Sequence, residues 1–416
     1  MKEGPLPVDA VLVGAGARGF GAYGAYALSH PEDLRFVAVA EPDERRRSRF
    51  GEDHGIPPSH RFGNWEELLG QPQLASAAIN ATMDGDHLPS TKGLLGHGYH
   101  VLLEKPIAAT PADCVRLVQA AADAGRLLQI SHELRYAPFF RAVHDLVRSG
   151  RLGEMVSLDW RENLSYLHFA HSYIRGRWSN SATSTPMIVS KCTHDMDQIL
   201  WIVDRVPSRI ASFGSLRHFQ SKHADPAIPE RCTDGCPIEQ DCLYYSPRQY
   251  LGSRRWGAIS LADLQHGPYG RCVFRSDNDA VDHQVVIVDF QDGPAVSLTM
   301  QGASHVEGRT LRIDGLQATL VASQARNQLI VHDHGTGEAE TISPTIMSGS
   351  HGGGDEGLVA AFVAATLDDH SPISTSGAES LESHLMAFAA EEARMTGRVI
   401  DMEEYRARWP VGRSGP

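Results

Sequence analysis

A glycine-rich turn near the start of the chain has the spacing of a dinucleotide site. The segment G-A-G-A-R-G directly follows the apolar run Val8–Val13 and opens a helical pattern. Its glycines allow a tight turn and a close backbone approach, so a pyrophosphate can lie at the helix N-terminus. The residues expected to contact the cofactor here are Gly14, Gly16, Ala17, Arg18 and Gly19. A glycine-rich turn without a ligand is the structural alternative.

Glu41 ends the second apolar run, at the position where an acid binds the adenosine ribose hydroxyls. A carboxylate there repels a 2′-phosphate, so the sequence favours NAD over NADP. Arg45 and Arg46 follow closely enough to weaken that preference.

Lys105 stands where a parallel strand would deliver a cation to a ligand. The run V-L-L-E-K-P ends in Lys105 and Pro106, and a cis bond before the proline fits the expected turn. Open α/β sheets bind ligands at the carboxyl ends of their strands, so this ammonium group can reach both a nicotinamide ribose and a substrate hydroxyl. By itself, E-K-P is also compatible with an ordinary strand-to-helix turn.

A histidine on the expected helix 187–203 is the candidate acid–base group. Histidine titrates near neutral pH, which suits His194 to take a proton from an alcohol as hydride leaves. Lys191 and Asp195 are four residues apart and can pair on one helical face. The structural alternative is a histidine capped by Asp197 in interdomain packing.

Three cysteines lie close together in C-T-D-G-C-P-I-E-Q-D-C, a segment of the Pro-, Cys- and Arg-rich insertion at about 221–270. Cys232, Cys236 and Cys242, with Cys272 as a fourth thiolate, could hold a structural zinc ion. Reduced thiols or one disulfide in a surface loop remain an equally weighted alternative.

The polar stretch before the His194 helix has side chains suited to a hydroxyl-rich ligand. Within H-F-A-H-S-Y-I-R-G-R-W, an indole can stack on a sugar face and a guanidinium can hold an anionic group. The residues assigned to the substrate here are His171, Tyr173, Arg177 and Trp178. A surface loop packed on the next helix is the alternative.

Two patterns of secondary structure must position these residues. Apolar runs alternate with helical stretches through residues 1–135, which predicts a doubly wound parallel sheet of the Rossmann type. Residues 136–416 begin with a helix, a strand from 155 to about 160 and an irregular stretch at 163–186. From residue 282 a period of two with hairpin signals predicts antiparallel strands, and a glycine-rich loop at 348–357 precedes two closing helices.

Charge and composition exclude other classes of protein. The 38 Lys and Arg against 51 Asp and Glu give a net charge of −13, so no nucleic-acid partner is expected. No apolar stretch approaches the ~18 residues of a membrane span, and the first dozen residues do not resemble a signal peptide. Six cysteines in 416 residues favour a reducing, cytoplasmic location.

The motifs together resemble the glucose-fructose oxidoreductase / inositol dehydrogenase / MocA family. The resemblance rests on G-A-G-A-R-G, L-L-E-K-P-I-A, R-Y-A-P, S-G-R-L-G and H-D-M-D, and the cysteine segment resembles a bacterial subgroup of that family. It implies an N-terminal Rossmann domain, a C-terminal α/β domain with a large open, mainly antiparallel sheet, and a homo-oligomer, dimeric or tetrameric.

The resemblance also implies roles for individual residues. Lys105 should lie near the nicotinamide and the reacting carbinol, and His194 should be the acid–base group. Further cofactor contacts are expected from Thr82, His87 and Glu104, and further substrate contacts from Arg135, Tyr136 and Asp195. The family commonly has Asp where this chain has Ser190, so Lys191 is the candidate to supply part of the proton relay.

The sequence leaves three functions open. The first is an NAD(P)-dependent oxidoreductase acting on a sugar, cyclitol or related polyol. The second is a glycosidase or lyase that retains its NAD and oxidises the sugar only transiently. The third is a non-catalytic dinucleotide-dependent sensor, which would need neither Lys105 nor His194.

Overall fold

The computed structural model describes residues 6–410, apart from 254, 258, 348–349, 369–370 and 372. Its first sheet has six strands in the order β3-β2-β1-β4-β5-β6, all parallel. The strands are β1 (Val8–Val13), β2 (Leu34–Ala40), β3 (Arg61–Phe62), β4 (Ala77–Asn80), β5 (His100–Leu103) and β6 (Leu128–Ile130). This order, with its reversal between β1 and β4, is that of a Rossmann sheet, as predicted.

Helices connect these strands and begin at recognisable caps. They are α1 (Ala25–Ser29), α2 (Glu44–Asp53), α3 (Trp65–Leu69), α4 (His87–Gly96) and α5 (Pro111–Ala124). The side chains of Asp43, Asn64 and Thr110 accept backbone N–H groups at the starts of α2, α3 and α5. The helical stretch after β1 contains a π-helical turn, Gly19–Gly24, ahead of α1.

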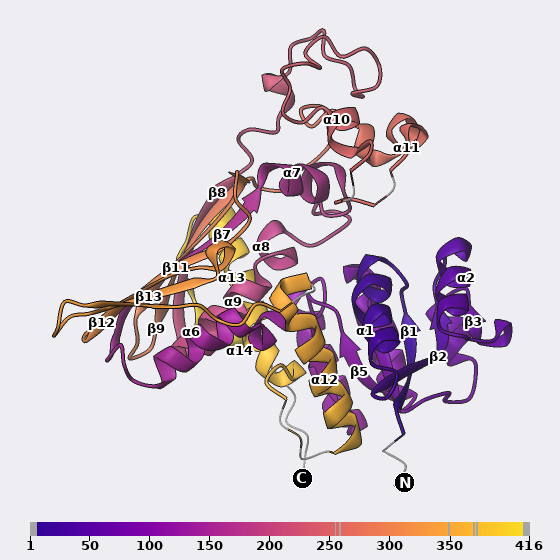
Figure 1. Cartoon of the computed structure of the whole chain (residues 1–416), viewed down its shortest axis with the longest axis horizontal. Coiled ribbons are helices and arrows are strands. Elements are labelled where there is room, and N and C mark those ends of the chain that lie inside the picture. Colours follow the sequence, from indigo (N-terminus) through magenta and orange to yellow (C-terminus); the bar gives the residue numbers. More distant parts are fainter. Residues whose placement is uncertain are drawn as a thin grey trace.

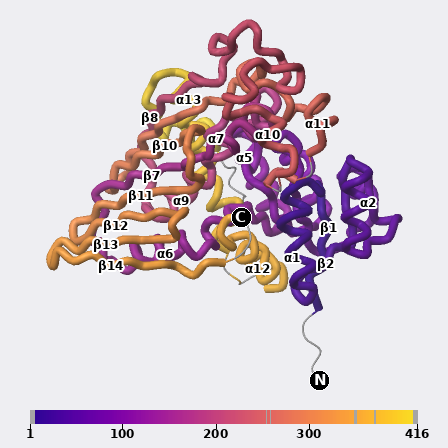
Figure 2. The backbone as a smooth tube through the Cα atoms, turned by 45° about the horizontal axis from the view of Figure 1, so that its top comes forward, coloured from indigo at the N-terminus to yellow at the C-terminus, as the bar shows by residue number. Residues whose placement is uncertain are grey.

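The second sheet has nine strands in the order β14-β13-β12-β11-β7-β10-β9-β8-β15, which Figure 2 shows side by side. The strands are β7 (Met155–Ser165), β8 (Pro207–Ser215), β9 (His283–Phe290), β10 (Ala295–Ser304), β11 (Gly308–Gly315), β12 (Ala318–Ser323), β13 (Gln328–Asp333), β14 (Ala339–Ile342) and β15 (Ile400–Asp401). All neighbours are antiparallel except β7 and β10, which confirms a mainly antiparallel sheet. The strand expected to end near residue 160 continues to Ser165.

Helices pack on one face of this sheet. They are α6 (Pro138–Arg148), α8 (Met187–Ser190), α9 (Thr193–Val203), α13 (Gly377–Thr396) and α14 (Met402–Ala407). The single helix expected over 187–203 is wrong, because the chain breaks at Lys191 and Cys192. At the break the Ser190 carbonyl accepts a hydrogen bond from the Lys105 ammonium group, 2.5 Å away.

Between β8 and β9 the chain forms an insertion, residues 216–282, that carries α10 (Ser246–Tyr250) and α11 (Leu261–His266). It lies over α7 (Tyr166–Phe169) at the top of Figure 1. A π-helical turn, Ala170–Arg175, continues α7. The stretch expected to be irregular is therefore largely helical where the insertion covers it.

One late helix returns to the first sheet. The apolar residues Leu358, Val359 and Phe362 of α12 (Gly354–Leu367) share a buried core with β1, β2 and β4. Both views place α12 beside α1 (Figures 1 and 2). The glycine-rich loop before α12 is thereby brought to the carboxyl edge of the parallel strands; Ser348 and Gly349 of that loop lie outside the described residues. No helix in the described ranges is long and apolar enough to cross a membrane.

Candidate active site

The glycine-rich loop after β1 has the shape that a bound pyrophosphate requires. Gly14 has φ of +90°, and a Cβ there would lie 2.5 Å from the Ala81 carbonyl oxygen. A Cβ on Gly19 would lie 2.0 Å from the Gly14 carbonyl oxygen. Nothing lies within 4 Å of the Cβ position of Gly16, which is open to the adjoining cavity. The loop therefore fits the dinucleotide phosphates predicted for it.

Glu41 lies in a cavity of about 380 Å³ next to this loop. Its buried carboxylate accepts hydrogen bonds from the backbone N–H groups of Ala15 and Asp43 at 2.8 and 2.9 Å. Arg46 forms an ion pair with it at 2.7 Å. The acid thus lines the cavity beside the glycine loop, with one arginine partly neutralising it.

A second cavity, of about 320 Å³, holds the candidate catalytic groups. Lys105, Lys191 and His194 all line it. The residues that border both cavities are Gly16, Ala81, Thr82, Met83 and Arg177. One extended ligand can therefore run from Glu41 to Lys105, as a nicotinamide dinucleotide does.

Lys105 is fixed by the structure around its backbone and its ammonium group. It precedes Pro106 through a cis peptide bond, and its N–H donates to the Ser131 hydroxyl at 3.0 Å. Burial, followed by the charge of Lys191, lowers the pKa of Lys105. A lowered pKa favours proton exchange with a substrate hydroxyl.

Glu104 is buried, and its carboxylate accepts a hydrogen bond from the backbone N–H of Lys105 at 3.3 Å. Burial alone would raise its pKa, but Arg18 at 2.6 Å and the Tyr23 hydroxyl at 2.7 Å lower the pKa of Glu104 to about 2. Arg18 also pairs with Asp355 of α12 at 2.8 Å. Both Arg18 and Glu104 still line the catalytic cavity, as expected.

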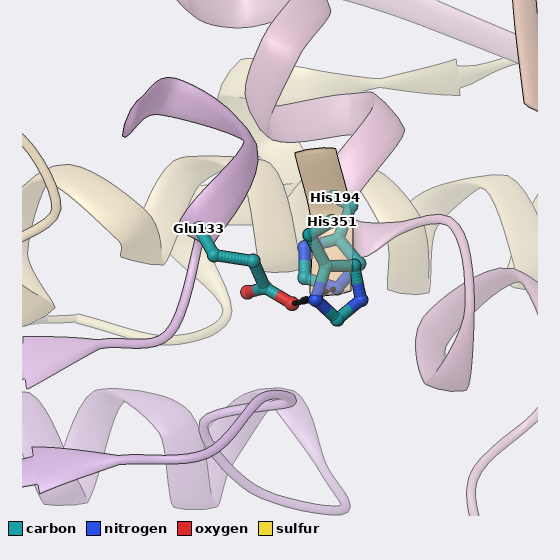
Figure 3. Close-up of side chains that lie close together, drawn as sticks. All are labelled: Glu133, His194 and His351. Atoms are coloured by element: carbon teal, nitrogen blue, oxygen red, sulfur yellow. Dashed lines mark ion pairs between the residues drawn. The ribbon is translucent and has the colours of Figure 1, made fainter. Parts of the chain in front are cut away.

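His194 lies against a carboxylate that the sequence reading did not assign. Its Nε2 atom is 3.6 Å from Oε1 of Glu133, and the same oxygen is 2.9 Å from Nδ1 of His351 (Figure 3). Burial, then the charge of Lys105, lowers the pKa of His194, so its neutral form can accept a proton. Burial opposes protonation of His351, but Glu133 and Asp355 raise its pKa to about 9. The site thus pairs a neutral histidine with a protonated one across a single carboxylate.

The pairing expected between Lys191 and Asp195 is wrong. Lys191 Nζ lies 3.3 Å from Oε1 of Glu162, because the helix break at this point removes the four-residue helical spacing. The fully buried Asp195 accepts hydrogen bonds from Trp160 at 2.7 Å and Arg309 at 3.0 Å. Asp195 does not line the cavity, so it is not placed to contact a substrate there, contrary to the prediction.

Three other assigned residues lie outside the cavity and pack around it. Arg135 forms a two-pronged ion pair with Asp197 at 2.8 and 2.7 Å, which also removes Asp197 as a cap for His194. The Tyr136 hydroxyl lies 3.2 Å from Gln129 Nε2. His87 is buried with Nδ1 2.6 Å from the Pro106 carbonyl oxygen. These contacts depend on tertiary packing, so the local sequence does not predict them.

His171 also lies outside the cavity. Its ring stacks on Trp256 and Tyr269 of the insertion at 4.1 and 4.4 Å, and burial lowers its pKa to about 4. Tyr173, Arg177 and Trp178 do line the cavity, as expected. The segment therefore presents Tyr173, Arg177 and Trp178 to the cavity and His171 to the insertion.

The sequence reading missed residues that enter the cavity from distant parts of the chain. They are Glu133, Arg309 and His351; His168, the first residue of the polar stretch discussed above, lines the cavity as well. Glu133 follows the last parallel strand, and this position at a strand's carboxyl end was a usable signal. His351 lies in the glycine-rich loop, whose location beside α12 no local pattern indicates.

The four clustered cysteines form no disulfide and lie together in the insertion, away from the catalytic cavity. They line a small cavity of their own, of about 10 Å³.

The parallel sheet, its phosphate loop and the lysine and histidine beyond it define a nicotinamide-dependent oxidoreductase fold. The profile described as the oxidoreductase family's NAD-binding Rossmann fold matches residues 8–132. The profile of that family's C-terminal α/β domain matches residues 144–402. The chain belongs to the glucose-fructose oxidoreductase / inositol dehydrogenase / MocA oxidoreductase family.

Known relatives are similar over part of their length. The chain is 26% identical over 299 residues to the oxidoreductase YteT of Bacillus subtilis (strain 168), covering 67% of this chain and 69% of YteT. It is 26% identical over 198 residues to inositol 2-dehydrogenase of Burkholderia multivorans, covering 47% and 55% of the two chains. The chain thus spans about half the length of that dehydrogenase.

Solved structures share the fold over nearly the whole chain. A levoglucosan dehydrogenase in complex with NADH and levoglucosan is 15% identical with a TM-score of 0.72, covering 95% of this chain and 99% of that one. An inositol dehydrogenase homologue from Azotobacter vinelandii with NAD+ is 15% identical with a TM-score of 0.70, covering 96% and 98%.

Proposed function

We propose that the protein is an NAD-dependent oxidoreductase that acts on a CH–OH group of a sugar, cyclitol or related polyol. The observation that carries the proposal is the common cavity of Lys105 and His194, continuous with the dinucleotide cavity. The named activities of the inositol and levoglucosan dehydrogenases support the substrate class. A non-catalytic sensor would not need a lysine and a histidine in one cavity.

The proposed mechanism divides the work among three residues. Lys105 donates a hydrogen bond to the substrate oxygen, and neutral His194 accepts the hydroxyl proton. Bound NAD would supply the acceptor for the hydride of the same carbon, so one hydride and one proton leave the substrate as its carbonyl forms. Lys191 supplies further positive charge beside that oxygen.

Glu133 takes the place of the acid that Ser190 does not supply. Its carboxylate oxygen lies 3.6 Å from His194 Nε2 and stabilises the imidazolium that forms when His194 takes the proton. His351 holds the same carboxylate oxygen at 2.9 Å. Glu133 is thus a positioning residue for His194.

The cofactor proposal is NAD in preference to NADP. It rests on Glu41 in the adenosine cavity, although Arg46 lies 2.7 Å from the carboxylate and reduces its repulsion of a 2′-phosphate. The substrate contacts proposed within the cavity are those of Tyr173, Arg177 and Trp178, with His168 added by the structure.

The protonated His351 favours one second candidate, a glycosidase or lyase that retains its NAD. Such a reaction needs an acid for the leaving group beside the base that assists oxidation. His351, with a pKa of about 9, is protonated at neutral pH and lines the same cavity as His194.

One experiment separates these functions. Purified protein is incubated with a panel of polyols, sugars and glycosides, and NADH absorbance and organic product are both measured. We expect one NADH for each carbonyl product, and none from Lys105→Met. Product without net NADH would establish transient oxidation, whereas no product from any compound would contradict both candidates.

We also propose a homo-oligomer formed through the face of the second sheet that none of the described helices covers. Phe213, Val285 and Ile287 lie on this face and are 71%, 37% and 43% exposed. Their strands are neighbours, with Phe213 opposite Val285, so the apolar side chains form one patch.

The cytoplasmic location remains a prediction from cysteine usage.

A further inference from the structure

Four cysteines of the insertion face one small cavity. Cys232, Cys236 and Cys272 are 5%, 8% and 7% exposed, Cys242 is half-buried, and none is in a disulfide. The cavity between them has a volume of about 10 Å³, close to the space occupied by one water molecule or ion. All four cysteines line it, together with apolar side chains such as Ile228 and Val273.

The backbone brings the four together from two separate segments. An antiparallel bridge pairs Arg231 with Arg271, and hydrogen bonds of 2.9 and 2.8 Å from the N–H groups of Cys232 and Cys272 flank it. Gly235, with φ of +80°, turns the chain back between Cys232 and Cys236. Two of the thiols, Cys236 and Cys272, form a small buried cluster with Ile228, separate from the main core.

A buried arginine beside the thiols lacks an anion. Arg175 is 2% exposed, and its guanidinium donates to the carbonyls of Arg271 and Tyr244 at 2.7 and 2.6 Å. The same group donates to Cys232 Sγ at 3.7 Å. No carboxylate among the described residues forms an ion pair with Arg175, yet buried charges in proteins are normally paired.

We propose that Cys232, Cys236, Cys242 and Cys272 bind one structural zinc ion as thiolates. Four sulfur ligands select zinc among the common divalent ions, and a four-coordinate site without a water is the structural type. Zinc displaces the four thiol protons, and the resulting centre is negatively charged. That charge is the missing partner of Arg175, whose N–H already points at Cys232.

The zinc site acts on the substrate cavity through the segment of residues 166–178. Arg175 belongs to this segment, and His171 of the same turn stacks between Trp256 and Tyr269 of the insertion. Tyr173, Arg177 and Trp178 of the segment line the catalytic cavity. The metal therefore fixes the insertion, and the insertion holds the substrate-facing side chains. The proposal is independent of which reaction the cavity performs.

The first test is the metal content of the full-length protein, purified without a histidine tag and without chelators. Elemental analysis should find close to one zinc per chain, and thiol titration of the denatured protein without reductant should find all six cysteines reduced. Zinc-free protein with six thiols, or with a disulfide in the cluster, would overturn the proposal.

Variants then assign the ligands. Cys236→Ser and Cys272→Ser should lose the zinc, whereas Cys114→Ala should keep it, because Cys114 is a buried residue of α5 outside the cluster. Arg175→Gln, which retains all four thiols, should weaken zinc binding by about 10-fold to 100-fold in competition with a chromophoric chelator, as loss of an outer partner does. Full zinc in both cysteine variants would contradict the assignment even if wild-type protein contains the metal.

A functional measurement distinguishes a structural from a catalytic metal. Arg175→Gln should raise KM for the substrate more than it weakens NAD binding, since Arg177 is the residue of the 166–178 segment that borders the dinucleotide cavity, whereas Tyr173, Arg177 and Trp178 all line the catalytic one. A loss of kcat with unchanged KM would show that the ion acts in the reaction, and would contradict a structural role.

Discussion

The Nδ1 atom of His351 lies 2.9 Å from Oε1 of Glu133, joining the loop before α12 to the end of the last parallel strand. The same oxygen faces His194. The proposed acid–base histidine thus lies against two residues that its own helix does not contain, and in the proposed mechanism these stand in for the acid that is absent at Ser190.

Replacing Glu133 should therefore matter more than restoring the acid at position 190. Glu133→Gln should lower turnover by ~10-fold or more and move the acidic limb of the kcat profile to lower pH, because the charge that favours imidazolium is lost. Ser190→Asp should change turnover only slightly. Steady-state kinetics measured across pH compares the two variants. An unshifted acidic limb in Glu133→Gln would show that Glu133 does not assist proton transfer at His194.

His351 should give the protein a stability that declines in alkali. Its folded pKa of about 9 lies above the ordinary 6.5, so its contribution is fully present below pH 6.5 and is lost as the pH rises through 9. The free energy of unfolding should fall more across this range in wild type than in His351→Gln. If the free energy of unfolding changes equally with pH in the two proteins, protonation of His351 does not stabilise the fold.

Lys105 and His194 should be separable from cofactor binding. Lys105→Met and His194→Ala should each lower turnover by ~100-fold or more, the usual scale for an acid–base group. NAD affinity should change little, because the glycine loop holds the pyrophosphate. Calorimetry with NAD and kinetics on the same samples test this, and full activity of Lys105→Met would disprove the assigned mechanism.

Cofactor choice should depend on Glu41 and its arginine. Wild-type protein should bind NAD at least ~10-fold more tightly than NADP, about 1.4 kcal/mol. Arg46→Ala should widen the difference, because Glu41 then repels a 2′-phosphate unopposed, and Glu41→Gln should narrow it. Titration calorimetry with both cofactors decides; equal affinities in wild type would mean that Arg46 cancels the acid.

The sequence predicted well where function depends on local backbone. Gly14 and Gly19 are glycines because a Cβ would collide with neighbouring carbonyl groups, so their spacing already specified the phosphate loop. Lys105 is placed by the strand that immediately precedes it. Where a helix was inferred from periodicity alone, over 187–203, the prediction failed because the Lys105 ammonium group engages the Ser190 carbonyl at the break.

The sequence by itself determined the class of fold, the shape of the glycine loop, and Lys105 and His194 as candidate reactive groups, since each depends on residue type and short spacing. Only the tertiary structure decided which polar residues share their cavity. Arg135 forms an ion pair with Asp197, and Asp195 forms one with Arg309. Glu133 and His351 come together in the cavity from segments more than two hundred residues apart in the chain. Such choices follow from burial, because a charged group removed from water must find a partner, and that partner is set by packing rather than by neighbours in sequence.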